Sequence, residues 1–295
     1  MKIAVVGSMN MDMIVHADRI PLKGETIQGE DVEYQPGGKG ANQAVAMARL
    51  GADVTMFGCV GRDQAGRELV ENLVNCGVHT EAIEYMDETV TGQAMITVGG
   101  GDNSIVVIPG GNECVDIEYV KRHEEHILEA DMLVLQNEIP EETVAYVIRL
   151  AYDNQKIIVW NPAPAKKAEE ELIRKVTYIT PNEHEAGIIW DTEKEEIPVL
   201  LKKYPEKLIV TQGEKGVAVC TKDGEVRLVP ARKVNVVDTT GAGDTLNGAF
   251  CFGLSNNMDI MDALEFANAA AGLSIQKSGA QKGMPTLEDV KKVME

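Results

Sequence analysis

Residues 237–250 read Val-Asp-Thr-Thr-Gly-Ala-Gly-Asp-Thr-Leu-Asn-Gly-Ala-Phe, a polar turn that leads into a run typical of a helix. Gly241, Ala242 and Gly243 carry little or no side chain, so an anion can approach their backbone N–H groups. Free donors and the helix dipole both favour negative charge at a helix N-terminus. The stretch therefore predicts a helix that begins with an anion-binding turn.

Asp244 follows this turn at once and falls in the first turn of the predicted helix. A carboxylate repels a phosphate, so Asp244 is unsuited to be a phosphate ligand. It is suited to remove the proton from an attacking hydroxyl while the neighbouring amides stabilise a phosphoryl group. The alternative is a capping role, because Asp is common at helix starts. The predicted catalytic residues are Asp244, Gly241, Ala242 and Gly243.

Upstream of this turn, short β-branched runs alternate with longer helical stretches, a pattern that predicts a parallel sheet covered by helices on both faces. The expected strands are Ile3–Val6, Val54–Gly58, Met132–Leu135, Lys156–Trp160, Tyr178–Thr180 and Leu208–Thr211. The expected helices are Gln64–Cys76, Glu141–Tyr152, Asn182–Trp190 and Glu193–Tyr204. In the first helix, Asp63 is placed as the N-cap, Gly77 as the stop, and Leu69, Val70, Leu73 and Val74 as the apolar stripe.

Two segments, about 12–34 and 89–108, break this alternation and contain glycine without helical periodicity. Within the second, Thr91–Val98 and Ser104–Ile108 flank three glycines and predict a hairpin. The two segments together predict a small sheet that lies over one edge of the main sheet, as a lid or a dimer surface. No repeat or linker divides residues 1–295, so we expect a single domain with a discontinuous lid.

A second polar cluster lies near the N-terminus. Asn10 and Asp12 follow the first predicted strand, and Gly37–Gln43 precedes an expected helix Ala44–Leu50. Asp12 can accept hydrogen bonds from vicinal hydroxyls, and asparagines both donate and accept. We expect the glycines to let a sugar ring lie against the backbone. The alternative, a turn with an N-cap, accounts for the glycines but leaves the Asn, Asp and Lys residues unexplained.

Composition limits the class of partner and compartment. With 28 basic and 47 acidic residues, the net charge of −19 argues against nucleic acid. Five separated cysteines without a C-x-x-C pair indicate reduced, buried thiols in a cytoplasmic protein. The N-terminus shows no signal peptide, and no apolar run is long enough for a membrane span. His123 and His126 lie on an expected surface helix, where solvation is favoured over metal binding.

The two polar segments together resemble the signatures of the ribokinase family, also called the PfkB carbohydrate kinases. Gly38–Gly61 is similar to the N-terminal signature, and Asp238–Cys251 is similar to the C-terminal one with its G-A-G-D core intact. Supporting stretches are Gly7–Asp12, Asn161–Ala165, Thr180–Ala186 and Lys277–Gln281. The resemblance extends over essentially the whole chain. It implies an α/β fold of the ribokinase-like type, a three-layer sandwich with a mostly parallel central sheet and a small β-sheet lid.

The resemblance also implies an activity: ATP-dependent phosphorylation of the primary (5-) hydroxyl of D-ribose, giving ribose 5-phosphate and ADP. Two alternatives stay open, namely a kinase of the same family with another acceptor (deoxyribose, another pentose or hexose, or a nucleoside) and a non-catalytic sensor of sugar or nucleotide. By matching residues, the substrate-binding set is Asn10, Asp12, Gly38, Lys39, Gly40, Ala41, Asn42, Glu138 and Asp244. The ATP-binding set is Asn182, Thr211, Gln212, Gly213, Glu214, Lys215, Gly216, Gly243 and Asn268.

Two cofactors and an assembly follow from the same resemblance. Mg²⁺ arrives with ATP and is influenced by Glu185, through water. A monovalent cation, expected to be K⁺, is held beside the anion-binding turn by Asp238, Thr240, Ser274, Lys277, Gly279 and Gly283. Gly283 departs from the family pattern, in which a serine is often found, so backbone or water replaces one oxygen there. The resemblance finally implies a homodimer formed through the lid.

Overall fold

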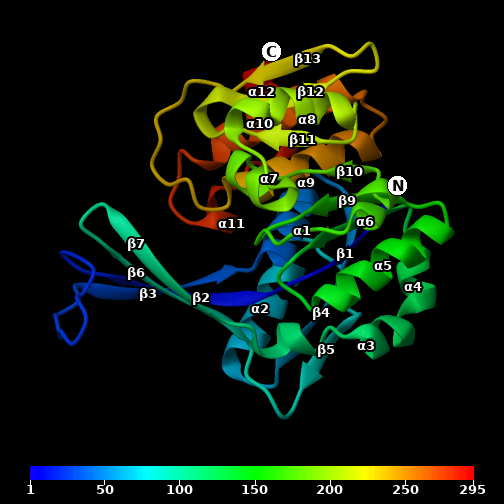
Figure 1. Ribbon diagram of the computed structural model, residues 1–295. Helices are drawn as coiled ribbons and strands as arrows, with labels where there is room; N and C mark the ends of the chain where they lie inside the picture. Colours follow the sequence, from blue (N-terminus) through cyan, green and yellow to red (C-terminus); the bar gives the residue numbers. More distant parts are fainter.

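The centre of the protein is a six-stranded parallel sheet in the order β10-β9-β8-β1-β4-β5, shown in a computed structural model that describes residues 1–295 (Figure 1). Its strands are β1 (Lys2–Val6), β4 (Asp53–Gly61), β5 (Ile83–Met86), β8 (Met132–Gln136), β9 (Ile157–Asn161) and β10 (Tyr178–Ile179). Five of the six predicted strands occur here, within a residue or two of the expected bounds except at the end of β4. The edge strand β5 was missed by the sequence pattern.

Helices cover both faces of this sheet. They are α1 (Lys39–Arg49), α2 (Gln64–Asn75), α3 (Ile117–Arg122), α4 (Glu124–Leu128), α5 (Glu141–Asp153), α6 (Glu170–Lys175), α7 (Glu183–Trp190), α8 (Ile197–Lys203), α9 (Ala242–Ser255), α10 (Ile260–Ser274), α11 (Ala280–Gly283) and α12 (Leu287–Met294). Single 3₁₀ turns are η1 (Gly110–Cys114), η2 (Lys194–Glu196) and η3 (Gly213–Lys215).

Alternate residues of each central strand enter different cores. Leu133 and Leu135 of β8 pack with α5, whereas Met132 and Val134 pack with α1. Because a strand with two buried faces needs apolar residues at every position, the continuous apolar runs of the sequence are explained. The predicted α/β class, with helices on both faces of a mostly parallel sheet, is confirmed.

A three-stranded antiparallel sheet continues the central sheet at its β10 edge. Its strands are β11 (Ile209–Thr211), β12 (Gly216–Cys220) and β13 (Val226–Pro230). Parallel bridges Ile179–Leu208 and Asn182–Thr211 join it to the β10 region. Leu208–Thr211 was predicted as a strand of the parallel sheet; it forms β11 at the edge of the three-stranded sheet, where it pairs with β12 in antiparallel fashion.

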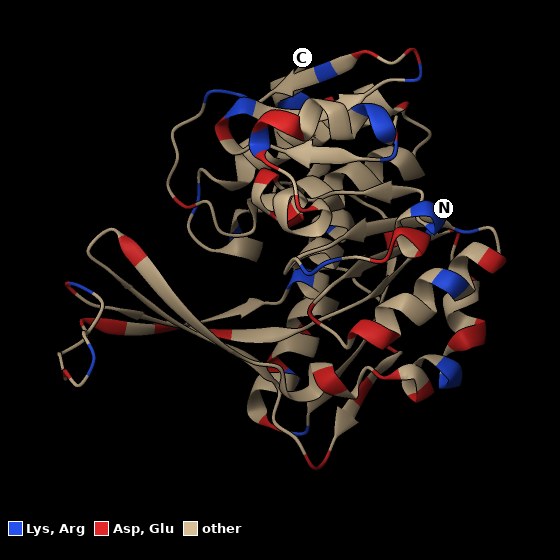
Figure 2. Cartoon of the chain, in the orientation of Figure 1, with Lys and Arg blue, Asp and Glu red and all other residues tan.

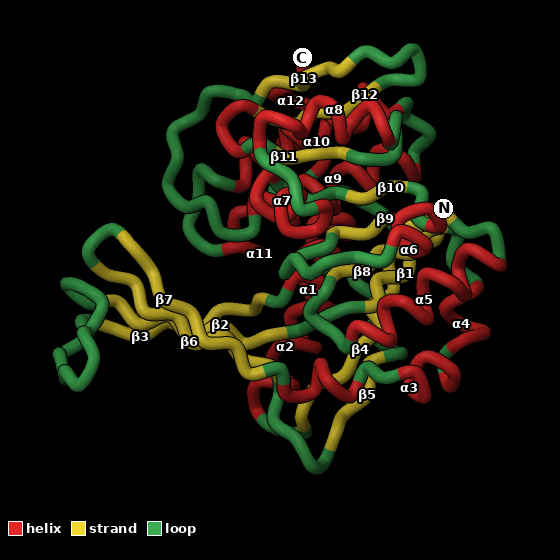
Figure 3. Tube along the Cα trace, viewed as in Figure 1, coloured by secondary structure: helices red, strands yellow, loops and turns green.

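A second sheet projects from the body, to the left in Figures 1 and 3. Its order is β3-β2-β6-β7, with β2 (Asn10–His16), β3 (Asp31–Gly37), β6 (Gly92–Gly99) and β7 (Asp102–Ile108). The hairpin between β6 and β7 pairs the two predicted strands directly. Strand β2 begins at Asn10 and β3 ends at Gly37, so this part extends beyond the predicted segment 12–34. These four strands together form the lid sheet.

Local signals in the sequence explain several helix ends. The Asp63 side chain accepts from the Gly66 N–H to cap α2, and Gly77 has a φ of 85° after it. Val74, predicted in the apolar stripe of α2, is 55% exposed and does not belong to the core. The predicted helix 193–204 is broken into η2 and α8, because Pro198 at the start of α8 cannot donate a backbone hydrogen bond.

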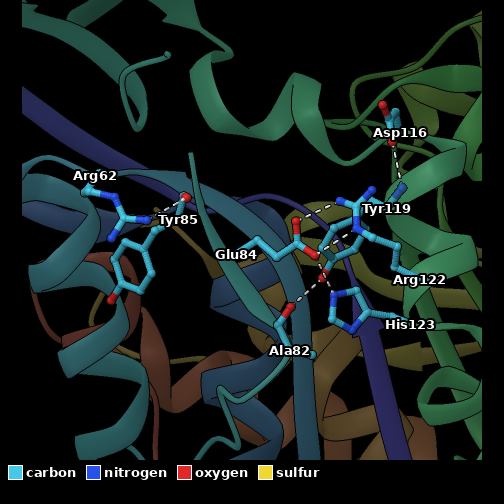
Figure 4. Close-up of polar contacts among 8 residues, drawn as sticks. All are labelled: Arg62, Ala82, Glu84, Tyr85, Asp116, Tyr119, Arg122 and His123. Atoms are coloured by element: carbon cyan, nitrogen blue, oxygen red, sulfur yellow. Dashed lines mark hydrogen bonds and ion pairs between the residues drawn. The ribbon is translucent and has the colours of Figure 1, made fainter. Parts of the chain in front are cut away.

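A polar latch fixes the edge strand β5 to α3 (Figure 4). Glu84 accepts from Arg122 Nε and Nη2 at 3.2 and 2.7 Å, and it lies 3.0 Å from His123 Nε2. Tyr119, fully buried, donates its hydroxyl to the Ala82 carbonyl at 2.6 Å. The predicted surface helix around His123 is thus interrupted at that residue, whose ring is half-buried between α3 and α4.

Charge and apolar surface are distributed unevenly. Figure 2 shows both signs of charge on the outer helices and few charged positions on the central strands. All five cysteines are free; Cys59, Cys220 and Cys251 are buried as predicted, whereas Cys76 and Cys114 are half-buried. No helix combines the length and the apolar character that crossing a bilayer requires.

Candidate active site

The turn before α9 has the geometry that its glycines predict. Gly241 is the N-cap of α9 with φ 74° and ψ 4°, a left-handed conformation that favours glycine. A β-carbon at Gly241 would lie 2.8 Å from Ala280 Cβ, so close packing also requires glycine there. Gly243 is exposed, with nothing within 4 Å of the place of a β-carbon. The Ala242 N–H donates to the Thr239 carbonyl at 3.2 Å, whereas the N–H groups of Gly241 and Gly243 have no acceptor, as is usual at a helix start, and leave an anion-binding turn at this end of α9.

Asp244 is 7% exposed, and each of its carboxylate oxygens accepts a hydrogen bond from α1. Asn42 Nδ2 donates to Oδ2 at 2.9 Å, and Gln43 Nε2 donates to Oδ1 at 3.1 Å. Each oxygen keeps a further lone pair. The bonds therefore fix the orientation of the carboxylate and leave it able to accept a proton.

Carboxylates from three different elements gather around this point. Three effects raise the pKa of Asp12 to about 7. The largest is burial, and the negative charges of Glu138 and Asp244 add to it. Burial lowers the pKa of the Lys39 ammonium, but Asp244, Glu138 and Glu185 outweigh burial and raise it. Asp12 of β2, Lys39 of α1, Glu138 after β8, Glu185 of α7 and Asp244 of α9 thus influence one another's charge.

The predicted sugar residues occupy the junction between β1, the lid sheet and α1. Asn10 accepts from Asn112 Nδ2 at 2.7 Å, so its own Nδ2 stays available. Glu138 Oε2 accepts from Ser8 Oγ at 2.5 Å and from the Lys39 backbone N–H at 3.0 Å. Gly37 leaves room for Asp12, because a β-carbon at position 37 would lie 2.6 Å from the Asp12 carboxyl carbon.

The structure gives two of the predicted glycines a packing role. Helix α1 begins at Lys39, not at Ala44, so Gly40–Gln43 lie inside it. A β-carbon at Gly38 would lie 2.7 Å from the Asn10 backbone nitrogen, and one at Gly40 would lie 2.6 Å from that of Ser8. These glycines let α1 pack against the residues after β1, and Ala41 adds an N–H bond to the Ser8 carbonyl at 2.9 Å. On the side where a β-carbon would project, both glycines face backbone, and the contact of a sugar ring with them stays a prediction.

The predicted ATP-binding residues Asn182, Thr211–Gly216 and Asn268 lie in or beside the sheet of β11, β12 and β13. Asn182 and Glu185 form a reciprocal capping box at the start of α7, with both bonds at 2.8 Å. Residues Thr211–Gly216 form the end of β11, the turn η3 and the start of β12, with Gly213 and Gly216 at positive φ. Asn268 on α10 donates to the Val229 carbonyl at 2.8 Å and thereby anchors β13.

The candidate cation residues connect the anion-binding turn to α11. Asp238 Oδ1 accepts from the Thr240 N–H and Oγ1 at 2.9 and 2.7 Å, and Asp238 Oδ2 accepts from the Gly279 N–H at 2.8 Å. Burial of the Asp238 carboxyl group raises its pKa, but these hydrogen bonds outweigh burial, so the pKa is lowered. At Gly283 a β-carbon would clash with the Ser274 carbonyl oxygen. A serine therefore does not fit at position 283 as the backbone stands.

Several buried carboxamides at the site were not predicted. Gln43 also donates to Asn161 Oδ1 at 3.1 Å and accepts from Gln136 Nε2 at 2.7 Å. Gln281 donates to Asn42 Oδ1 at 2.9 Å. The available signal was adjacency, because Asn42-Gln43 is a polar pair inside an otherwise apolar helix. Buried amides need partners, and these find them in each other and in Asp244, except that the Gln136 Oε1 oxygen has no hydrogen-bond partner.

Comparison with known proteins places the chain among sugar kinases. The family described as "pfkB family carbohydrate kinase" matches residues 1–287. The ribokinase of Lactococcus lactis is 47% identical over 293 residues, covering 98% of this chain and 96% of that protein. The ribokinase of Bacillus subtilis is 46% identical over 292 residues, covering 99% of each.

Solved structures agree with these relatives. The ribokinase of Thermotoga maritima is 34% identical, with a TM-score of 0.89 and 99% of each chain covered. The ribokinase of Arabidopsis thaliana, solved with ribose and ATP, is 29% identical, with a TM-score of 0.90 and coverage of 100% of this chain and 98% of that one.

Proposed function

Because the chain belongs to the pfkB family of carbohydrate kinases, we propose that it transfers the γ-phosphoryl group of ATP to the 5-hydroxyl of D-ribose, yielding ribose 5-phosphate and ADP. The observation that carries the proposal is Asp244, a buried carboxylate held by two amides directly after an open helix N-terminus. The ribokinases that it resembles at 46–47% identity support ribose as the acceptor.

In the mechanism, the residues of the chain position the reactants and stabilise charge. Asp244 accepts the proton of the 5-hydroxyl as its oxygen attacks the γ-phosphorus, and the bond from that phosphorus to the β–γ bridging oxygen breaks to release ADP. The N–H groups of Gly241, Ala242 and Gly243 stabilise the negative charge on the transferring group. Amide bonds to both Asp244 oxygens hold the base in place while the proton moves.

The sugar is held by polar groups from both sides of the junction. Asp12 and Glu138 accept hydrogen bonds from its secondary hydroxyls, and Asn10 Nδ2 and the Lys39 ammonium donate. Asn42 contributes its remaining amide hydrogen, and Gly38, Gly40 and Ala41 shape the wall by close backbone packing. A ligand with vicinal hydroxyls matches this pairing of acceptors and donors.

ATP is proposed to bind at Asn182, the 211–216 segment and Asn268, with its phosphates directed to the turn at Gly243. Mg²⁺ neutralises the phosphate charge when it is bound with the nucleotide. The carboxylate of Glu185, whose charge also raises the pKa of Lys39, would act on Mg²⁺ through water, since hard oxygen donors are the ligands that Mg²⁺ prefers.

We propose that a monovalent cation, K⁺, binds beside the anion-binding turn. The residues that would hold it are Asp238, Thr240, Ser274, Lys277, Gly279 and Gly283. The hydrogen bonds that tie Asp238 to both Thr240 and Gly279 support the proximity of these segments. Replacing K⁺ by tetramethylammonium at constant ionic strength is expected to lower turnover severalfold, because that ion is too large for a carbonyl-lined site. Unchanged turnover would remove the cation from the mechanism.

We further propose that residues 1–295 act as one kinase domain whose lid sheet closes over the sugar to exclude water. The free cysteines support a reducing, cytoplasmic compartment. The lid sheet is also the surface proposed for a homodimer, and the proposal includes neither nucleic acid nor membrane as a partner.

The proposal is tested by ADP release from a panel of acceptors at fixed MgATP. Ribose is expected to give the highest kcat/KM among pentoses, 2-deoxyribose, hexoses and nucleosides. A higher value for another acceptor would reassign the substrate within the family. Ligand binding without ADP release for any acceptor would instead identify a sensor that has lost turnover.

A further inference from the structure

Asp244 lies at the end of a chain of carboxamides that begins outside the site. Asn72 Nδ2 on α2 donates to Gln281 Oε1 at 2.7 Å. Gln281 Nε2 on α11 donates to Asn42 Oδ1 at 2.9 Å. Asn42 Nδ2 then donates to Asp244 Oδ2 at 2.9 Å. Asn42 and Gln281 are each 6% exposed, so solvent does not replace these partners.

The direction of this chain follows from the charge of its last member. An ionised carboxylate only accepts, so Asn42 must turn its amide nitrogen to Asp244 and its oxygen to Gln281. Gln281 must therefore donate to Asn42. Each donor in such a chain polarises the next, which strengthens the final bond to the carboxylate.

Helix α11, which carries Gln281, touches the site at two other points. The Gly279 N–H at its start is bound to Asp238, and Ala280 packs against Gly241 in the anion-binding turn. The same helix packs against β3 of the lid sheet, where a β-carbon at Gly279 would lie 2.5 Å from Gln35 Oε1. One short helix thus contacts the lid sheet, the anion-binding turn and, through Gln281, the support of the base.

We propose that Gln281 is a positioning residue for Asp244: by donating to Asn42, it fixes the amide that orients the base and ties that orientation to α11. The inference rests on the proposed function and deepens it, because it names a residue that acts on the base without touching substrate. Gln281 reaches Asp244 through an intermediate group, so its effect passes through the Asn42 carboxamide.

Two substitutions at this position separate positioning from packing. Gln281→Leu keeps most of the volume and removes the donor at every pH. Gln281→Glu is nearly isosteric, but the ionised form of the new side chain only accepts. Asn42 must then turn its oxygen toward Asp244, where two oxygens repel. When the introduced carboxyl group is protonated, its O–H donates to Asn42 Oδ1 and restores the original direction.

The first test is steady-state kinetics of wild type and both variants between about pH 6 and 8.5, with MgATP and ribose saturating. Losing one buried hydrogen bond predicts about a tenfold lower kcat for Gln281→Leu at all pH values. For Gln281→Glu we expect about a hundredfold loss at high pH that recovers to within about tenfold of wild type at low pH. The KM for ATP should stay within about threefold. Equal loss in both variants at every pH, or kcat above half of wild type in both, would overturn the proposal.

The second test does not depend on turnover. In ¹⁵N–¹H NMR spectra, the side-chain amide signals of Asn42 are expected to shift in Gln281→Glu at high pH and to return toward their wild-type positions at low pH. Signals that never move would refute the positioning role even if the protein phosphorylates ribose. If wild type releases no ADP with ribose, the proposed function fails, and these spectra still decide the role of Gln281.

Discussion

At Asp12, burial and two neighbouring carboxylates act in the same direction. The folded protein holds the proton on Asp12 up to about pH 7, whereas an unfolded Asp loses it near about pH 4. Because the folded state binds this proton more tightly, folding stability falls as pH rises between those two values. The residue is therefore retained at a cost in stability, which is common for groups that bind ligand.

The substitution Asp12→Asn is expected to separate stability from binding. At about pH 8 the variant should be more stable than wild type by on the order of 1 kcal/mol, and the difference should shrink toward about pH 4. At about pH 8, where Asp12 is ionised, the KM for ribose should rise at least about tenfold in the variant, because a charged acceptor to the hydroxyls is lost. Urea unfolding at both pH values and steady-state kinetics measure these effects. A variant less stable than wild type at high pH would contradict the assigned environment of Asp12.

Single residues were predicted from the sequence where their chemistry is local. Asp244 and its glycines could be identified because a free helix N-terminus and the adjacent carboxylate lie within four consecutive residues. Gln281 could not, since its partner Asn42 is 239 residues away and only the packing of α11 on α1 joins them. The packing role of Gly38 and Gly40 could not be predicted from the sequence either, because it depends on their contact with the backbone of Met9 and Ser8.

Among the elements, β5 depends on the polar latch at Glu84. The hydrogen bonds from Arg122 lower the pKa of Glu84. Burial acts in the opposite direction, and the hydrogen bond with His123 lowers the pKa further. A lowered pKa in the folded state means that the stabilisation is present above the unfolded pKa of about 4.3 and is lost as pH falls through the folded value. The paired side chains are partly exposed, so solvent reduces the strength of the latch.

We expect Glu84→Gln to lower the free energy of unfolding by about 1 kcal/mol at neutral pH. The difference from wild type should shrink as pH falls below about 4.3 and vanish only below the lowered folded pKa of Glu84, where both side chains are neutral. Urea unfolding provides the measurement, and Glu81→Gln, a change at an exposed carboxylate nearby, is the control. A pH-independent loss, or an equal loss in the control, would show that the charge of Glu84 does not hold β5.

Elements with continuous apolar runs or clear caps were predicted well, as β1, β8 and α2 show. The start of α1 was placed too late, because the glycines before Ala44 read as a loop although tertiary packing makes them helical. The strands β5, β12 and β13 were not predicted. Edge position and a length of four residues explain the omission of β5, whereas β12 and β13 are as long as β1 and β8 and their antiparallel pairing was not visible in the pattern.

For the whole molecule, the lid sheet presents exposed apolar side chains along its edge strand. Ile105, Val106 and Val107 of the edge strand β7 are 52, 60 and 52% exposed. Successive residues of a strand point to opposite faces, so both faces of β7 are apolar and open. Exposed apolar edge strands favour association, and this supports the homodimer proposed above.

Light scattering is expected to give twice the mass of one chain at micromolar concentration. The double change Ile105→Lys with Val107→Lys should halve that mass, because it places charge on one face of β7. A wild-type monomer would exclude the dimer. A variant that stays dimeric would move the interface away from that face of the lid sheet.

The central claim is that Asp244 takes the proton of the sugar while the turn before α9 holds the phosphoryl group. The most direct measurement is the ribose-dependent kcat of Asp244→Asn, with ribose binding followed separately by calorimetry. Loss of a general base predicts a kcat lower by roughly 10²–10⁴, with a much smaller change in ribose affinity. A variant that binds ribose and keeps more than about a tenth of wild-type turnover would contradict the account.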